Sequence, residues 1–443
     1  MVEQSRSRTL LDRLARLDGE AADRPELQRE MEQHERLFAE LREAYGDRDD
    51  PVETLRRIVL PGPLSDRRLA ELERQVTCLD DLVGAPLSAA PASSRAPDLP
   101  RGEVVLSYWT VQDEVLAFIV DGKKVKLLRG LASRREVEQL VARLRQSLGR
   151  TGADTRFAAA AERTTRTTLR ALSERLLEPI ASELTTRRLV IMPVGVMHGI
   201  PFAALPVGDE CAGDRWEITH APGLGIYSLC AHRQRRRDVP SLVVGVPEPD
   251  LPYVHQEVRA IETLVPNTVT LLGQEAVYSA IPTEGEYNFI HFATHAMFRS
   301  DNPFFSGLKL ADGWLLGCDL YRRNLRCRVA VLAACRTGAV QVAPGEELLG
   351  LARCVLAAGA RSVLVSLWDA NDAVTAALMG CFYARTASGA APAVALREAQ
   401  TLVRQRWPDP FHWAAFVLVG AGWDAETLPP RAGKLRRRKE PTP

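Results

Sequence analysis

Apolar residues recur along this chain with two different spacings, and the spacing changes near residue 100. Before that point they return every three or four positions, as on one face of a helix, within 10–17, 37–45 and 69–79. No self-similar period connects these stretches, so a repeat array is not indicated. The pattern predicts a helical interaction region over residues 1–83.

Residues 84–100 are rich in Ala, Pro and Ser, which is typical of a linker. Three strand-length apolar runs follow it: 104–109, 115–120 and 124–128. Asp121-Gly122 lies between the last two and predicts a hairpin turn. Two helical stretches come next, over 135–148 and 162–183, and Pro179 is expected to end the second one early.

From residue 188 onward, near-continuous apolar runs alternate with helical stretches. The apolar runs are 189–193, 241–246, 268–272, 287–293, 329–333, 362–367 and 415–419. The helical stretches are 256–264, 348–358, 373–385 and 392–407. This alternation predicts a mostly parallel sheet flanked by helices, with strands buried on both faces. Active sites in such sheets lie at the carboxyl ends of the strands, which directs attention to residues just after each run.

Composition limits the classes of function that fit this chain. With 443 residues it is long enough for two or three domains, and 46% hydrophobic with 26% charged residues is ordinary for a soluble globular protein. The formal net charge is +1, so no overall field attracts nucleic acid or a membrane surface. The basic runs 235–237 and 434–439 are expected to be solvated surface.

No targeting segment or membrane span is expected, so we predict a cytoplasmic protein. The eight cysteines include no CxxC pair, which leaves zinc knuckles and thioredoxin-type redox motifs unsupported. They are expected to be free thiols in a reducing compartment. No phosphate-binding GxxxxGK[ST] run is present either, so the sequence predicts neither a metal nor any other cofactor.

Two of the predicted strands end close to a residue that can do acid–base or nucleophilic chemistry. His295 follows the run 287–293, and an imidazole can take up a proton near neutral pH. Cys335 follows the run 329–333, beside Arg336, a cation of the kind that lowers the pKa of a thiol. One crossover of chain separates the two ends, so adjacent parallel strands would bring a base and a nucleophile together.

The other histidines and cysteines favour structural roles. His291 lies inside an apolar run and is expected in the core, and His412 lies in a proline-flanked turn. His198, in a loop beside a glycine and a proline, is the main rival for the role of base. The remaining cysteines are expected to pack as small apolar side chains: Cys78, Cys211, Cys230, Cys318, Cys327, Cys354 and Cys381.

The order of these motifs resembles that of the CHAT-domain family of caspase-like cysteine peptidases, which is related to separase. The matching segments are 192–193, 198–205, 221–222, 291–295, LAACRTG at 332–338, 345–347, 358–360, 366–368 and 395–400. They fall within about 101–423. The resemblance implies an α/β fold with a pseudo-caspase-like half at 101–240, a catalytic half at 241–423 and a basic tail at 424–443.

In that family the histidine and the cysteine form a catalytic dyad, a role that carries over to His295 and Cys335. The family's oxyanion donors are two backbone N–H groups, which correspond here to Ala296 and Cys335. The family usually has Gly where this chain has Ala296, and Ala adopts a positive φ less readily. The implied activity is that of a cysteine endopeptidase, a hydrolase that cleaves a protein substrate.

The loop after 366–368 helps to form the specificity pocket in this fold. Asp369 opens that loop and Asp372 follows it, and a buried carboxylate there would favour Arg or Lys before the scissile bond. Glu346 and Glu347, in the loop after the nucleophile, are further candidates. All four can equally be solvated loop acids.

Two other functions stay open. The fold can serve as a catalytically silent scaffold, although this chain keeps both dyad residues. Alternatively the N-terminal helices can form a signalling module that binds an activating protein partner, with the peptidase as its output. Members of the family often act in regulated proteolysis or bacterial defence, and the Arg- and Ala-rich composition fits a bacterium with GC-rich DNA. We expect no direct nucleic-acid or membrane partner.

Overall fold

The computed structural model describes residues 99–424, apart from 123, 154–157, 234–237, 299–302, 334–344 and 369–370. Side chains at 152–153, 303 and 345–349 are also outside the description. The predicted helices of 1–83, most of the linker and nearly all of the basic tail therefore lie outside the described residues. So do Cys335 and Asp369, and the side chain of Glu346.

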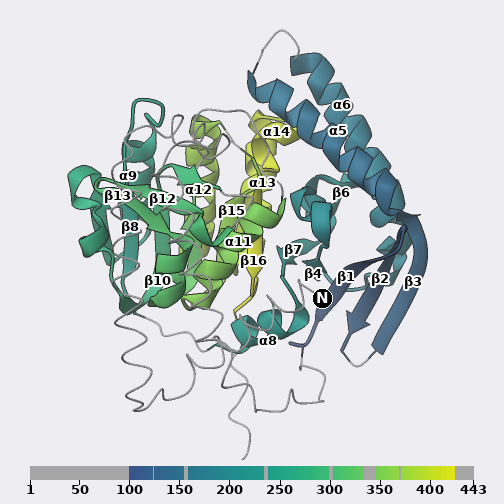
Figure 1. Ribbon diagram of the computed structural model, residues 1–443, viewed down its shortest axis with the longest axis horizontal. Helices are drawn as coiled ribbons and strands as arrows, with labels where there is room; N and C mark the ends of the chain where they lie inside the picture. The colour runs from purple at the N-terminus through teal and green to yellow at the C-terminus, as the bar shows by residue number, and fades with distance from the viewer. Residues whose placement is uncertain are drawn as a thin grey trace, which may run out of the picture.

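Eleven strands of the described residues form one large mixed sheet. They are β1 (Glu103–Val111), β2 (Glu114–Asp121), β3 (Lys124–Ser133), β4 (Arg188–Met192), β7 (Glu217–His220), β8 (Ser241–Gly245), β9 (Thr268–Leu272), β10 (Glu284–Ala293), β14 (Asn324–Leu332), β15 (Ala360–Ser366) and β16 (Phe416–Gly420). Their order across the sheet is β3-β2-β1-β4-β7-β16-β15-β14-β10-β8-β9 (Figure 1). The predicted hairpin is present as β2 and β3.

Apart from the antiparallel strands β2 and β3, the sheet consists of two parallel groups that run in opposite directions. Strands β1, β4, β7 and β16 are parallel to one another, and so are β15, β14, β10, β8 and β9. The two groups meet where β16 pairs antiparallel with β15. The carboxyl ends of β4 and β7 consequently lie at the opposite edge of the sheet from those of β8, β10 and β14.

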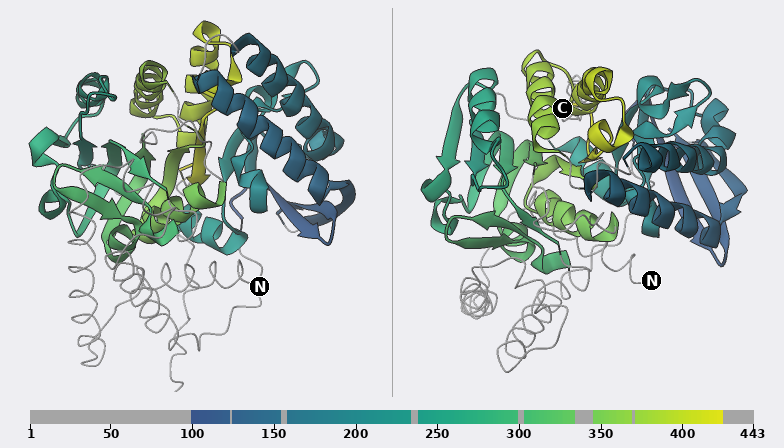
Figure 2. Two further views of the ribbon diagram at one scale, coloured as in Figure 1. Left: turned by 45° about the horizontal axis from the view of Figure 1, so that its top comes forward. Right: turned by 90° about the horizontal axis from the view of Figure 1, so that it is seen from above.

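Helices cover both faces of the sheet, as the alternating pattern predicts. The longer ones are α5 (Arg134–Ala153), α6 (Ala158–Leu176), α8 (Leu224–His232), α9 (Val254–Leu264), α11 (Gly345–Ala357), α12 (Asp372–Ala387) and α13 (Pro392–Arg406). Figure 2 shows α9, α12 and α13 on one face of the second group and α11 on the other. Pro179 has the predicted effect, because α6 stops at Leu176 and the short turn η2 (Glu178–Glu183) follows.

Short elements that the apolar pattern does not predict complete the fold. They are β5 (Pro206–Val207), β6 (Glu210–Cys211), α7 (Ala212–Arg215), α10 (Gly317–Arg322), α14 (Pro410–Trp413) and a three-stranded sheet of β11 (Ala296–Met297), β12 (Gly307–Leu310) and β13 (Gly313–Leu316). β7 was not predicted either. Its four residues, Glu-Ile-Thr-His, carry only one aliphatic side chain, so no apolar run marks it.

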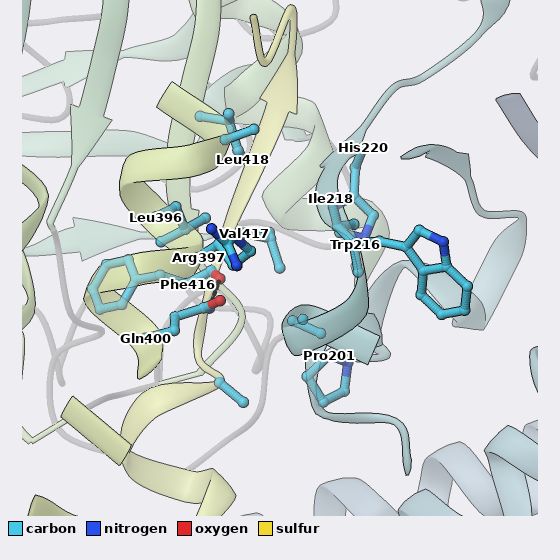
Figure 3. Close-up of a pocket in the computed structure, with 14 residues that line it drawn as sticks. Pro201, Trp216, Ile218, His220, Leu396, Arg397, Gln400, Phe416, Val417 and Leu418 are labelled. Carbon is cyan, nitrogen blue, oxygen red and sulfur yellow. Dashed lines mark hydrogen bonds between the residues drawn. The ribbon is translucent and has the colours of Figure 1, made fainter. Parts of the chain in front are cut away.

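The seam between the two halves is narrow. β7 and β16 share one ladder pair, His220 with Val419, and the Thr219 hydroxyl donates to the carbonyl of Gly420 over 2.7 Å. A small pocket opens beside it (Figure 3), with His220 and Ile218 on one wall and Arg397 of α13 on the other. β16, β15 and β14 separate this pocket from β10, so it is distinct from the strand ends discussed below.

None of the helices that the structure describes is both long and apolar enough to cross a bilayer.

Candidate active site

Three neighbouring parallel strands, β8, β10 and β14, end together at one edge of the sheet. Phe292 of β10 is in register with Val244 of β8 and Leu332 of β14. Beyond the strands, the Val246 N–H donates to the Ala293 carbonyl over 3.0 Å, and the Ala333 N–H donates to the Phe292 carbonyl over 3.1 Å. The three loops that follow therefore start side by side.

This register relates the two sequence-predicted catalytic residues. His295 comes three residues after Phe292, and Cys335 comes three residues after its partner Leu332. The strands β10 and β14 are hydrogen-bonded neighbours, so their extensions leave the sheet about 4.8 Å apart. Cys335 itself lies outside the described residues, and its pairing with His295 stays a prediction.

The imidazole of His295 is held from one side by two carboxylates. It is 3% exposed, and its Nε2 lies 3.0 Å from Asp250 Oδ1 and 3.1 Å from Glu248 Oε2. Both acids come from the loop between β8 and α9. The opposite ring nitrogen, Nδ1, is buried and has no hydrogen-bond partner within the part of the chain that the structure describes.

This arrangement selects one tautomer of the neutral imidazole. A carboxylate accepts hydrogen bonds, so the proton of the neutral ring belongs on Nε2, and Nδ1 then carries the free lone pair. When Nδ1 takes up a second proton, the adjacent carboxylates offset the positive charge of the imidazolium. The geometry thus makes Nδ1 of His295 the basic atom of the site.

The hairpin of β11 and β12 fixes His295 and one of its acids. The Lys309 N–H donates to the His295 carbonyl over 2.8 Å, and the Thr294 hydroxyl donates to the Lys309 carbonyl over 2.6 Å. The Lys309 ammonium then reaches Glu248 Oε1 at 2.8 Å. One residue of β12 therefore positions both the backbone of His295 and the carboxylate of Glu248.

Glu248, Asp250 and His295 each offer a ligand atom within 4.8 Å of the others, a spacing that a metal ion could bridge. Lys309 already places a positive charge against Glu248, and the contacts to Nε2 have hydrogen-bond length. We therefore assign the carboxylates to orienting the imidazole.

Of the tentative substrate-binding residues, the structure describes only the side chain of Asp372. It is half-buried in the first turn of α12, and its Oδ2 accepts the Tyr253 N–H over 3.0 Å. Burial raises the pKa of Asp372, and the negative charges of Glu257 and Asp250 add to the shift. Asp372 thus belongs to the same acidic edge as His295, while its role in substrate binding stays a prediction, like those of Asp369 and Glu346.

His291 lies in the core, as predicted. It is fully buried, with Nδ1 3.0 Å from the Tyr383 hydroxyl of α12 and Nε2 3.2 Å from Glu257 Oε1 of α9. These contacts join β10 to the two helices that cover it. His291 therefore supports the strand from which His295 extends.

The rival base His198 is at the wrong edge of the sheet. It lies in the turn η3 (Gly195–Gly199) after β4, whose carboxyl end is opposite to that of β10. Burial lowers the pKa of His198 to about 3, with Arg353 and His220 contributing. His198 is therefore not a suitable proton acceptor for Cys335 at neutral pH.

The predicted oxyanion donor Ala296 is buried in β11, opposite Leu308 of β12. The backbone of Ala296 does not have a positive φ, which the described non-glycine residues show only at Gln112, Asp238 and Asn267. The departure from Gly at this position thus causes no backbone strain here.

Sequence reasoning missed Glu248, Asp250 and Lys309. The first two follow a predicted strand, so the rule that directed attention to strand ends could have found them. Lys309 carries no such signal, because it reaches the site through a two-stranded hairpin that the apolar pattern does not show.

The fold is that of caspase-like proteins. The separase–securin complex of Saccharomyces cerevisiae is similar in two crystal structures, with a TM-score of 0.53 in each and 11% and 12% identity. The match covers 72% of this chain and 30% of that one. A likeness to the Arg specific cysteine proteinase gingipain R, at a TM-score of 0.39, is too weak to support a conclusion.

Residues 166–421, more than half of the chain, match the CHAT domain model, and the chain belongs to that family. Curated relatives are Tetratricopeptide repeat protein 28 of Homo sapiens, 24% identical, and of Mus musculus, 25% identical. Each match covers 57% of this chain but only 13% of the relative. The predicted family and the predicted caspase-like α/β fold are confirmed.

Proposed function

We propose that this chain is a cysteine endopeptidase in which Cys335 is the nucleophile and His295 is the general base. One observation carries the proposal: two carboxylates hold Nε2 of His295 and leave Nδ1 as the acceptor, at the strand end next to the one that leads to Cys335. Catalytic histidines are oriented in this way when they activate a nucleophile.

The reaction follows from these roles. Nδ1 of His295 takes the proton of the Cys335 thiol, and the thiolate attacks the carbonyl carbon of the scissile peptide bond. The imidazolium then gives its proton to the leaving amine as the C–N bond breaks, which leaves a thioester on Cys335. Water, deprotonated by Nδ1, attacks the thioester carbon; the C–S bond then breaks and the acid is released, while the imidazolium returns its proton to the Cys335 thiolate.

The register of β11 and β12 supports Ala296 as an oxyanion donor. The Lys309 N–H donates to the His295 carbonyl, so the neighbouring pair Ala296–Leu308 is a non-hydrogen-bonded pair of the ladder. The Ala296 N–H then points away from β12 and can donate to the tetrahedral oxyanion. The Cys335 N–H is the second donor in this proposal.

The acidic character of this edge favours a substrate with a basic residue before the scissile bond. Asp250 and Asp372 add negative charge beside His295, and the described part of the site offers Lys309 as the cation that pairs with Glu248. Asp369 and Glu346 remain candidates for the pocket itself. An activating protein partner bound through residues 1–83 belongs to the same proposal.

Cleavage of three matched fluorogenic peptides, with Arg, Leu or Asp before the reporter, tests this function. We expect the wild-type chain to prefer the Arg peptide, because a carboxylate pairs with a guanidinium. Cys335→Ala and His295→Ala should each lose roughly 10³-fold or more in kcat/KM, because each removes a partner in the proton transfer.

Cys381→Ala is the matched control, since Cys381 is a half-exposed thiol of α12 whose pKa is raised by burial. It should cleave at the wild-type rate. Undiminished cleavage by Cys335→Ala would refute the assignment of the nucleophile, and preference for Leu or Asp would refute the basic pocket. A folded wild-type chain that cleaves none of the peptides or denatured proteins would favour the scaffold function.

A further inference from the structure

One face of the β1–β2–β3 sheet carries exposed apolar side chains, beyond the end where Tyr227 of α8 contacts Glu103. Tyr108 of β1 points toward the helices, where its hydroxyl donates to the Leu176 carbonyl of α6 over 2.7 Å. Side chains alternate along a strand, so Trp109 and its cross-strand neighbours point to the opposite side. We call this side the outer face.

The apolar part of the outer face includes Trp109, Val111, Phe118, Val125 and Leu127. These residues are neighbours across the strands. Phe118 of β2 pairs with Leu127 of β3, and Val120 of β2 pairs with Val125 of β3. The rings of Trp109 and Phe118 lie 6.4 Å apart. Exposure is 46% for Trp109, 51% for Val111, 64% for Val125 and 47% for Leu127.

This density of exposed apolar residues is specific to the outer face. The described residues include seven exposed large hydrophobic side chains, and four of them lie here. The other three are scattered over separate elements of the second half. A contiguous apolar patch on a sheet face marks a surface that another segment covers.

We propose that the outer face is covered by residues 69–79 of the same chain, which lie outside the described structure. In this segment Leu69, Leu72, Val76 and Leu79 recur at the spacing of one helical face, which predicts an apolar stripe that needs a partner. As a helix it would be about 15 Å long, enough to cross three strands about 10 Å wide in all.

The connection between the segment and the face favours this occupant. β1 begins at Glu103, and the far end of the face, Val111, lies eight residues along that strand, about 26 Å away. The linker 84–100 can extend over about 55 Å, so it reaches any part of the face. Such a tether gives a local concentration in roughly the millimolar range, which a second copy or a separate protein does not have.

A photo-crosslinking amino acid at position 127 of the full chain tests the proposal. Leu127 is exposed, so its replacement should leave the fold intact. We expect crosslinks from position 127 to residues 69–79 in most crosslinked molecules. The matched control is position 402 in α13, since Leu402 is 47% exposed as well and lies on the second half. Crosslinks from position 402 to residues 69–79 should be absent.

Mixing isotopically light and heavy chains distinguishes one chain from two. Crosslinks confined to light–light and heavy–heavy pairs, at the mass of one chain, support docking within the chain. Mixed light–heavy products would overturn the proposal in favour of a second copy, and the absence of any crosslink from position 127 to residues 69–79 would overturn it altogether.

Hydrogen exchange of the full chain gives an independent measurement. Leu127→Glu should speed amide exchange within residues 69–79 at least tenfold, because a charged side chain within the apolar patch disfavours docking. Leu402→Glu should leave that exchange at the wild-type rate. Equal exchange in the wild type and Leu127→Glu contradicts the proposal, and peptidase activity plays no part in either measurement.

Discussion

Among single residues, Glu248 and Asp250 differ in how firmly they hold His295. Glu248 is 23% exposed at its side chain and is fixed by Lys309, whereas Asp250 is 63% exposed and water can replace it. We expect Glu248→Gln to lower kcat about a hundredfold and Asp250→Asn to lower it only a few-fold. The loss for Glu248 should stay below the roughly 10⁴-fold seen where one buried carboxylate orients the histidine alone.

Steady-state kinetics of both variants and of the double variant checks this difference. If the two acids share one function, the double variant should lose more than the product of the single losses, since neither carboxylate remains to hold the tautomer. Lys309→Met is a control for the position of Glu248, because it removes the ion pair that holds Glu248 but keeps both carboxylates. Equal losses in Glu248→Gln and Asp250→Asn would contradict the ranking.

Sequence reasoning singled out the histidine of this candidate site but not the residues that contact it. His295 stands out because an apolar run ends just before it, and that boundary is local. The support from Lys309 depends on the β11–β12 pairing, and the support from Glu248 and Asp250 depends on which strand lies next to β10. Neighbours across a sheet are fixed by long-range pairing, which no local pattern contains.

Among the elements, the contact between β16 and β15 depends on a glycine. Gly420 ends β16 with a φ of 103°, and an added Cβ would lie 2.5 Å from the Arg361 carbonyl. Gly389 has a similar φ of 95°, but a Cβ there meets nothing within 4 Å. We expect Gly389→Ala to cost about 1 kcal/mol of unfolding free energy from strain alone, and Gly420→Ala a further 1–3 kcal/mol, roughly, from the clash.

Urea denaturation of the two variants measures the difference. The matched φ values cancel the backbone strain, so what remains reports the close approach of β16 to β15. Equal unfolding free energies would show that the contact between β16 and β15 relaxes around an added methyl group.

The strands were predicted more completely than their directions. All the long apolar runs from 104 onward became strands, including β3, which is largely exposed. Most of the others are buried on both faces, and such burial leaves a local mark in the sequence. The reversal between the two parallel groups was not foreseen, since it arises where β16 inserts between β7 and β15, which lie far from it in the sequence. That reversal is what places His198 at the opposite edge from His295.

At the scale of the whole molecule, the two halves are joined at α8, which also contacts a buried acid. Glu103 of β1 is 4% exposed and accepts a hydrogen bond from the Tyr227 hydroxyl of α8. Arg361 of β15, in the other half, donates to the carbonyls of Cys230 and Ala231 at the end of α8. Burial raises the pKa of Glu103 to about 7, against the lowering effects of Tyr227, Arg188 and Arg361.

This pKa makes the stability of the folded chain sensitive to pH. The carboxyl group binds its proton more tightly in the folded chain than in the unfolded chain, where its pKa is near 4.5. Its contribution to stability is therefore complete below about pH 4.5 and is lost as the pH rises through about 7. Between pH 5 and pH 8 the loss amounts to about 2–3 kcal/mol of unfolding free energy.

Glu103→Gln should remove this dependence, because the amide keeps an acceptor for Tyr227 and never ionises. We expect the change in unfolding free energy from pH 5 to pH 8 to differ between wild type and Glu103→Gln by about 2–3 kcal/mol, with the variant relatively more stable at pH 8. Comparing the two chains at both pH values cancels the titration of every other group. Parallel pH profiles would mean that Glu103 stays ionised in the fold and that Arg361 and Arg188 outweigh its burial.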